Sequence, residues 1–309
     1  MNILVTGGAG FIGRAIIKKL STDNNIIILD NFLEQVHGAT PNKNIPDCTV
    51  IEGDISDKKA WELAFSYNPD IILHLASETG TGQSMTEITR YANTNIIGTT
   101  LMLDLLNNTK HNVKKVILSS SRAVYGEQDN IESNKKLNPL SVYAVTKLTQ
   151  EQLISSSLNI PYTIFRYQNV YGPGQSIKNP YTGIISIFSK KFRSNFDVDI
   201  WDNGKPTRDF VYIDDVVDAT ILSIDNSHTN NQIINVGTGE AISILEVTKI
   251  LRDKINKNCK INITKYHRPG DILHAKADIT KAKKLGWVPK VNIIQGLHRF
   301  NTWFKTQET

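Results

Sequence analysis

The sequence has few cysteines and lacks long apolar runs. Only Cys48 and Cys259 occur among 309 residues, so we expect neither a disulfide framework nor a cysteine metal site, and we predict no bound metal. The longest apolar stretches, such as 26–29, fall far short of the ~18 residues that a membrane span requires. The chain opens on a strand-like segment in place of an export signal, which favours a cytoplasmic location.

The chain also lacks a large excess of charge of either sign. The chain carries 35 basic and 30 acidic residues, with a formal net charge of +5 and a pI of about 9.0. The two signs are interleaved along the chain, so no basic stripe is predicted, and we expect neither a nucleic-acid partner nor a membrane partner. A hydrophobic share of 40% is sufficient for the core of a globular protein.

Short apolar segments alternate with helical patterns through the first half. Continuous apolar strands separated by amphipathic segments are typical of a parallel sheet that is covered on both faces. We therefore predict an α/β fold with a doubly wound parallel sheet, the Rossmann architecture, over residues 1–170. Residues 171–309 are expected to form mainly a smaller substrate-binding annex, with some segments returning to the Rossmann core. The expected strands are 3–5, 26–29, 49–51, 71–75, 115–118 and 162–166, and later helices are expected at 214–223, 243–256 and 278–285.

A glycine-rich turn lies between the first strand and the first helix, in the run Thr6-Gly7-Gly8-Ala9-Gly10-Phe11-Ile12-Gly13. In this context Gly7 permits a tight turn, Gly10 lets the backbone approach a pyrophosphate, and Gly13 lets the helix pack on the strand. The turn therefore predicts a dinucleotide site. The alternative is a glycine-rich turn that binds no ligand.

Acidic residues follow the second and third strands. Asp30, beside Asn31, is placed to accept hydrogen bonds from the adenosine ribose and to repel a 2′-phosphate. NAD(H) is therefore favoured, and NADP(H) is possible. Asp54 has two interpretations, because it is placed either to meet the adenine edge or to cap the helix that begins near Asp57.

A tyrosine and a lysine lie four residues apart between the fifth and sixth predicted strands. Tyr143 and Lys147 share one face of a helix, so the ammonium group is expected to lower the pKa of the phenol. A tyrosine shifted down from about 10 exchanges a proton near neutral pH. Together with the dinucleotide turn, the pair predicts an enzyme that moves a hydride and a proton.

Six motifs occur in order along the chain and resemble those of the extended short-chain dehydrogenase/reductases of the NAD-dependent epimerase/dehydratase type, which act on nucleotide sugars. They are the glycine turn, Gly53-Asp54-Ile55, His74-Leu75-Ala76, Ser119-Ser120-Ser121-Arg122-Ala123-Val124-Tyr125-Gly126, the Tyr143/Lys147 pair and the run from Arg208 to Asp215.

The resemblance implies roles for single residues. Tyr143 corresponds to the general acid/base, Lys147 to the residue that bonds the nicotinamide ribose, and Ser121 to the hydroxyl that binds the sugar oxygen. Further cofactor contacts are implied for Phe11, Ile12, Asn31, Ile55, Leu75 and Ala76. Substrate contacts are implied for Thr79, Ser121, Arg122, Asn169, Arg208 and Arg268, with the arginines suited to a diphosphate.

Two positions narrow the reaction. Dehydratases of this family carry an Asp-Glu pair where this chain has Arg122 and Ala123, so a 4,6-dehydratase is not expected. Arg122 is open to two interpretations, a contact to a phosphate or sugar hydroxyl, or a surface ion pair. The loop from Glu78 to Met85 lacks the lysine that UDP-galactose 4-epimerases have at its second position, which is Thr79 here.

These departures favour a reductase that turns dTDP-4-dehydro-6-deoxyglucose into dTDP-fucose (dTDP-6-deoxy-D-galactose) for bacterial surface polysaccharides such as O-antigen. Asp30 suits a resident NAD+ and favours the alternative, a 4-epimerase acting on a dTDP-6-deoxyhexose or a UDP-hexose. A third reading is a non-catalytic NAD-binding module, which has no need of Ser121, Tyr143 and Lys147. The resemblance also implies a homodimer that pairs helices 86–107 and 143–157 of each chain as a four-helix bundle. Packing against the chain's own sheet is the alternative for much of that apolar surface.

Overall fold

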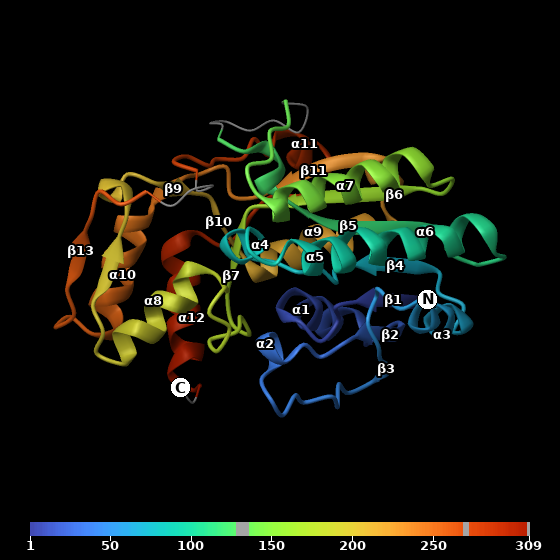
Figure 1. The fold of residues 1–309 in the computed structure, drawn as a ribbon, viewed down its shortest axis with the longest axis horizontal. Coiled ribbons are helices and arrows are strands. Elements are labelled where there is room, and N and C mark those ends of the chain that lie inside the picture. The colour runs from blue at the N-terminus through green and yellow to red at the C-terminus, as the bar shows by residue number, and fades with distance from the viewer. Residues whose placement is uncertain (128–135, 268–271, 308–309) are drawn as a thin grey trace.

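The computed structural model describes residues 1–127, 136–267 and 272–307 and is built around one parallel sheet (Figure 1). Its strands run in the order β11-β6-β5-β4-β1-β2-β3. All six predicted strands are present, and the predicted fold class is confirmed. The seventh strand, β11, was not predicted, because Gln232 and Asn235 interrupt its apolar pattern. The strands are β1 (Asn2–Thr6), β2 (Asn25–Asp30), β3 (Cys48–Glu52), β4 (Ile71–His74), β5 (Lys115–Ser121), β6 (Tyr162–Tyr167) and β11 (Gln232–Val236).

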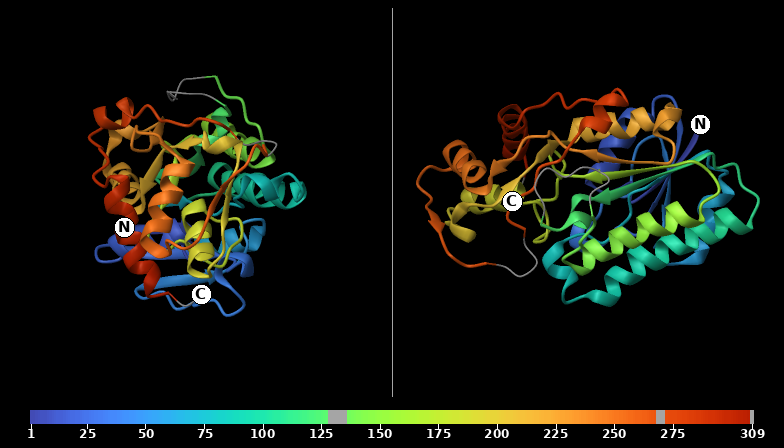
Figure 2. Two further views of the ribbon diagram at one scale, coloured as in Figure 1. Left: turned by 90° about the vertical axis from the view of Figure 1, so that its left-hand side faces the viewer. Right: turned by 90° about the horizontal axis from the view of Figure 1, so that it is seen from above.

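Each face of the sheet packs under its own layer of helices (Figure 2). Successive side chains of a strand point to opposite faces, so Ile3 and Val5 join one hydrophobic cluster and Leu4 the other. Because every strand is covered on both sides, its sequence is apolar at consecutive positions. The first cluster includes side chains of α1 (Phe11–Leu20) and α9 (Ile213–Asp225), and the second includes those of α3 (Lys58–Ser66), α6 (Gly98–Asn108) and α7 (Val142–Ser157).

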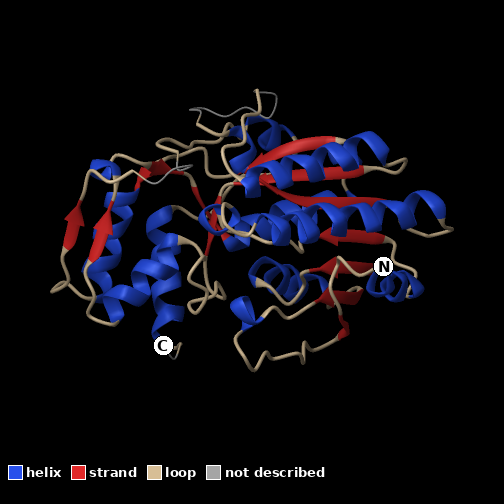
Figure 3. Ribbon diagram, viewed as in Figure 1, coloured by secondary structure: helices blue, strands red, loops and turns tan. Residues whose placement is uncertain are grey.

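The annex lies beyond one end of the sheet and contains three two-stranded sheets (Figure 3). They pair β7 (Asn169–Tyr171) with β10 (Phe210–Tyr212), β9 (Thr207–Arg208) with β12 (Ile242–Ser243), and β8 (Val198–Ile200) with β13 (Ile261–Ile263); the annex helices are α8 (Ile184–Arg193), α10 (Ile244–Ile255) and α12 (Ile293–Lys305). The short helices are α2 (Glu34–His37), α4 (Thr81–Ser84), α11 (Thr280–Lys284), η2 (Arg122–Tyr125), η3 (Asp202–Gly204) and η4 (Ser227–Thr229). Within the described ranges, no helix has the length and apolarity needed to cross a membrane.

The helix predicted at 86–107 is interrupted. It consists of α5 (Ile88–Tyr91), the π-helical η1 (Ala92–Ile97) and α6. The π turn carries Asn95, which is fully buried and whose Oδ1 accepts hydrogen bonds from Glu78 N at 2.8 Å and from Ser77 Oγ at 3.0 Å. Single π turns recur at functional sites, and this one fixes the loop that follows β4.

Candidate active site

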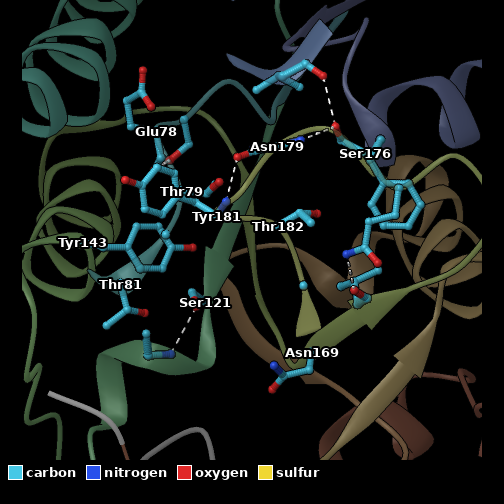
Figure 4. A pocket seen from close by; sticks show the side chains of 18 of the residues that line it. Glu78, Thr79, Thr81, Ser121, Tyr143, Asn169, Ser176, Asn179, Tyr181 and Thr182 are labelled. Carbon is cyan, nitrogen blue, oxygen red and sulfur yellow. Dashed lines mark hydrogen bonds between the residues drawn. The ribbon is translucent and has the colours of Figure 1, made fainter. Parts of the chain in front are cut away.

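A cavity of about 860 Å³ lies at the carboxyl end of the parallel strands, and both the sheet and the annex line it (Figure 4). Of the residues predicted for the site, Asp54 and Lys147 do not line it, and Arg268 lies outside the described residues. Those that line the cavity are Gly7, Gly10, Phe11, Ile12, Gly13, Asp30, Asn31, Ile55, Leu75, Ala76, Thr79, Ser121, Arg122, Tyr143, Asn169 and Arg208.

The glycine turn forms one end of the cavity. Gly7 has a φ of +69°, which favours glycine, and a Cβ at this position would lie 2.7 Å from Ala76 N. A Cβ on Gly13 would lie 2.6 Å from Gly7 O, so only glycine lets α1 pack this closely on the turn. Gly10 is the N-cap of α1 and provides no side-chain cap. The helix start is therefore open to the cavity, and this cradle fits the pyrophosphate of a dinucleotide.

Asp30 ends β2 and holds two backbone segments together. Its Oδ2 accepts a hydrogen bond from Ala9 N, and its Oδ1 one from Phe32 N, each at 2.9 Å. His37 Nε2 lies 3.7 Å from Oδ1, and burial lowers the pKa of this imidazole although Asp30 acts to raise it. A carboxylate beside a largely neutral histidine suits ribose hydroxyls better than a 2′-phosphate.

Asp54 does not cap the helix that begins near Asp57, and its contact to the adenine edge stays a prediction. Asp57 itself caps α3 by accepting a hydrogen bond from Lys59 N at 2.9 Å. Asp54 instead accepts hydrogen bonds from Ser56 N and from Asn31 Nδ2, each at 2.8 Å. It thereby holds the side chain of Asn31, which lines the cavity.

The two predicted catalytic hydroxyls come together. Ser121 ends β5, Tyr143 lies in the first turn of α7, and both line the cavity, with their hydroxyl groups directed to the same space (Figure 4). Burial raises the pKa of the Tyr143 phenol, while a hydrogen bond with Ser121 acts to lower it. Lys147 was expected to lower this pKa, but it is not among the groups that shift it, and its Nζ donates to Ser77 Oγ at 3.3 Å.

Lys147 is buried beneath this pair. Its side chain is 2% exposed, and burial lowers its pKa to about 7, although the nearby Glu151 carboxylate acts to raise it. Glu151 is itself paired with Arg166, whose Nη2 lies 2.6 Å from Oε2. The Glu151 carboxylate therefore only partly offsets the effect of burial on Lys147. As a result, Lys147 loses its proton far more easily than a lysine in water.

Two arginines line the annex end. Arg122 is 8% exposed, so it forms no surface ion pair, which removes one of its two interpretations. Its Nη2 donates to Gly126 O at 3.0 Å, and its buried Nε has no protein partner among the described residues. Burial and the neighbouring Arg208 cation lower the pKa of Arg122 to about 9. Two adjacent cations at one end of a cavity suit an anionic ligand group.

Gln168 is one of several polar residues that the sequence did not suggest but that line the cavity. In the described ranges eight buried side-chain polar atoms lack a hydrogen-bond partner, and four of them belong to Arg122, Asn169 and Gln168. Buried polar groups are normally paired, so these four atoms indicate a polar ligand. A signal for Gln168 was available, because it directly precedes Asn169 at the end of a predicted strand.

Residues 3–237 match the NAD-dependent epimerase/dehydratase family. The chain belongs to this family. The match covers the glycine turn, both predicted catalytic hydroxyls and Arg208, and confirms the predicted resemblance. NAD is the cofactor of the family, as predicted.

Family members resemble the chain over almost its whole length. The dTDP-L-rhamnose 4-epimerase of Burkholderia thailandensis is 35% identical, with 97% of this chain and 94% of the relative aligned. The UDP-glucose 4-epimerase of Thermotoga maritima, solved with UDP-glucose, superposes with a TM-score of 0.88 at 32% identity and covers 99% of both chains. The UDP-glucose 4-epimerase of Thermus thermophilus, solved with NAD, has a TM-score of 0.88 at 27% identity and also covers 99% of both chains.

Proposed function

We infer that the protein is an NAD-dependent nucleotide-sugar 4-epimerase. The observation that carries this proposal is the placement of Tyr143 and Ser121 between a dinucleotide cradle and a pair of arginines in one cavity. The named relatives favour the epimerase over the dTDP-fucose-forming reductase that the sequence suggested. That preference rested on departures from family patterns at a few positions, Thr79 and Arg122 among them, and these positions do not distinguish the two reactions.

The cofactor end fits NAD. We propose that Gly7, Gly10, Phe11, Ile12 and Gly13 hold the pyrophosphate and that Asp30 binds the adenosine ribose, with Asn31, Ile55, Leu75 and Ala76 lining the rest. When bound, NAD supplies the reversible oxidation that turns a sugar hydroxyl into a carbonyl and back. Lys147 reaches Ser77 at the floor of the cavity and is placed to bond the nicotinamide ribose.

The catalytic hydroxyls act on the proton of the sugar C4 hydroxyl. Tyr143 accepts this proton as the carbonyl forms and returns it after the keto sugar has rotated to present its other face. Ser121 donates a hydrogen bond to the same oxygen and holds it in place. Burial raises the pKa of Tyr143, so the phenol keeps its proton at neutral pH unless a nearby cation favours the phenolate. The forward step needs this phenolate as the base, and we propose that protonated Lys147, one helical turn away, favours it in the complex with NAD and substrate.

The substrate end fits a sugar linked to a nucleoside diphosphate. Arg122 and Arg208 are placed to bind the diphosphate, and Asn169 Oδ1, which has no partner among the described residues, is available to accept a hydrogen bond from a hydroxyl of the ligand. Thr79 lines the sugar pocket. We propose a dTDP-6-deoxyhexose or a UDP-hexose as substrate, in the supply of surface polysaccharides such as O-antigen.

We also propose a homodimer. Ile88 of α5, Ile97 of η1 and Val145 of α7 are 56%, 45% and 47% exposed. They lie on the two helical segments from which the resemblance builds a dimer. Other apolar side chains of these segments, Tyr91, Leu103 and Ile154, are buried within one chain.

Turnover decides between epimerase and reductase. Purified protein is incubated with UDP-glucose or dTDP-L-rhamnose and NAD+, and products are identified by NMR. Interconversion of C4 epimers without net cofactor consumption is the expected result. Stoichiometric oxidation of NADH with dTDP-4-dehydro-6-deoxyglucose, without epimerisation of either sugar, would contradict the proposal and restore the reductase.

A further inference from the structure

Gln168 lies where the catalytic and substrate ends of the cavity meet. Its backbone N–H donates to Val236 O at 2.9 Å, which continues the pairing of β6 with β11. The preceding residue, Tyr167, is in register with Ser121 on β5. Gln168 and Arg122 therefore each follow the last paired residue of two adjacent parallel strands, so both lie next to the catalytic serine.

The side chain of Gln168 is held in place while its amide is left without partners. The residue is 5% exposed and lines the cavity. A Cβ on Gly237 would come within 2.6 Å of Gln168 Cγ, so the stem of the side chain packs directly on the backbone of that glycine. Within the described residues, neither Nε2 nor Oε1 has a hydrogen-bond partner. An unpaired buried amide destabilises a protein, so its presence at this place indicates a ligand that supplies the missing hydrogen bonds.

The chemistry of the amide indicates which part of the ligand it meets. A carboxamide offers two donors and an acceptor, whereas a phosphate offers acceptors only and would leave Oε1 unpaired. The two arginines already serve an anion. A hydroxyl both donates and accepts, and sugar hydroxyls flank the carbon on which Tyr143 and Ser121 act.

We propose that Gln168 is a specificity-determining residue that hydrogen-bonds a hydroxyl of the sugar ring adjacent to the reacting carbon. This inference rests on the proposed function and deepens it by assigning a residue that selects the sugar. The carboxamide group of nicotinamide would also pair with the Gln168 side chain. The second test below distinguishes a contact to the cofactor from a contact to the sugar.

The first test is the thermal stability of the ligand-free protein, with a matched glutamine as control. Gln175 also lines the cavity and is 7% exposed, but its Nε2 donates to Val170 O at 3.3 Å and its Oε1 accepts from Ser186 Oγ at 3.0 Å. Gln175→Leu removes satisfied hydrogen bonds and is expected to lower Tm. Gln168→Leu removes unpaired polar atoms and is expected to leave Tm unchanged or raise it. A fall in Tm equal to that of Gln175→Leu would make Gln168 structural and overturn the proposal.

The second test is sugar selection. Wild type and Gln168→Leu are compared on UDP-glucose and its 2-, 3- and 6-deoxy analogues by kcat/KM, and calorimetry gives the affinity of each for NAD+ and for UDP-glucose. We expect Gln168→Leu to lose roughly ten- to a hundredfold in kcat/KM on the full substrate. We also expect one deoxy analogue on which the two proteins perform equally, and an unchanged affinity for NAD+.

The remaining outcomes overturn one proposal or both. A weaker affinity of Gln168→Leu for NAD+ with unchanged sugar selection would assign the amide to the cofactor. Normal epimerisation by both proteins, with equal selectivity, would overturn the role of Gln168 and leave the proposed function intact. Wild-type protein that neither binds nor converts a nucleotide sugar would overturn both.

Discussion

The phenol of Tyr143 has the most direct contact with the proposed chemistry. Tyr143→Phe removes the hydroxyl while keeping the ring, which meets Tyr91 edge-on with ring centroids 6.5 Å apart. Loss of a general acid/base is expected to lower kcat by roughly 10²–10⁴-fold. Affinity for NAD+, measured by calorimetry, should stay within a factor of about three, because the residue acts on the substrate proton. Full activity of the variant would remove Tyr143 from the mechanism.

Lys147 links the site to stability. Burial lowers its pKa to about 7 in the folded protein, against about 10.4 in the unfolded chain. Between these values the unfolded chain binds more protons, so the stability contributed by this group rises with pH across that window. Lys147→Met removes the buried cation. We expect Lys147→Met to raise the free energy of unfolding most at or below pH 7, by less toward pH 10, and to lower kcat by roughly 10²-fold.

Urea unfolding of both proteins at several pH values measures this effect, and Lys190→Met on the exposed side of α8 is the control. A stability difference that does not vary between pH 7 and 10 would contradict the assigned cause.

The position of a single residue was predictable where that residue ends a strand or a helix. Ser121 and Asp30 end strands of a parallel sheet, so their meeting at one edge followed from the pattern. The pKa of Tyr143 did not follow, because helical spacing places Lys147 nearby but does not show that Lys147 is buried or that its ammonium donates to Ser77. Gln168 was missed because its importance lies in what it does not contact.

The glycine turn and α1 act as one element, and two substitutions separate packing from ligand approach. At Gly13 a Cβ would meet backbone atoms of Gly7 and Gly8 at 2.6–2.7 Å, whereas at Gly10 the nearest atom is Gly7 O at 3.2 Å. Gly13→Ala is therefore expected to destabilise the protein by about 1–3 kcal/mol. Gly10→Ala, whose φ of −73° any residue adopts, should change stability by less than about 1 kcal/mol but weaken NAD+ binding by obstructing the pyrophosphate.

Thermal unfolding and calorimetry with NAD+ read out the two effects separately. If Gly10→Ala binds NAD+ as well as wild type does, the pyrophosphate does not approach the backbone there.

Elements with one simple periodicity were predictable, and those shaped by tertiary contacts were not. The six predicted strands are apolar at consecutive positions because helices cover both faces. β11 carries Asn235 within its run, and this side chain is buried because Tyr125 OH donates to its Oδ1 at 2.9 Å. The π turn at Ala92–Ile97 likewise depends on where Asn95 finds partners, in a loop that is distant in sequence.

Over the whole molecule, α7, which carries Tyr143, and the neighbouring α5 also present exposed apolar side chains. Ile88 and Val145 are 56% and 47% exposed, and α5 and α7 contact each other within the chain. Association of two copies through this surface would bury apolar area and fix α7, and with it the position of Tyr143. A glutamate introduced on this surface would place an unpaired carboxylate in the interface between the two copies, which is strongly unfavourable.

The double substitution Ile88→Glu with Val145→Glu is therefore expected to convert a dimer into a monomer in light scattering coupled to gel filtration. Ile294→Glu is the matched control, because Ile294 is similarly exposed, at 53%, but lies on α12 in the annex. We expect the control to remain dimeric. Wild-type protein that is monomeric at micromolar concentration would contradict the proposed dimer, and a dimer unaffected by the double substitution would place the interface on another surface. If monomers also lose activity while Ile294→Glu keeps it, the position of α7, and hence of Tyr143, depends on the second copy.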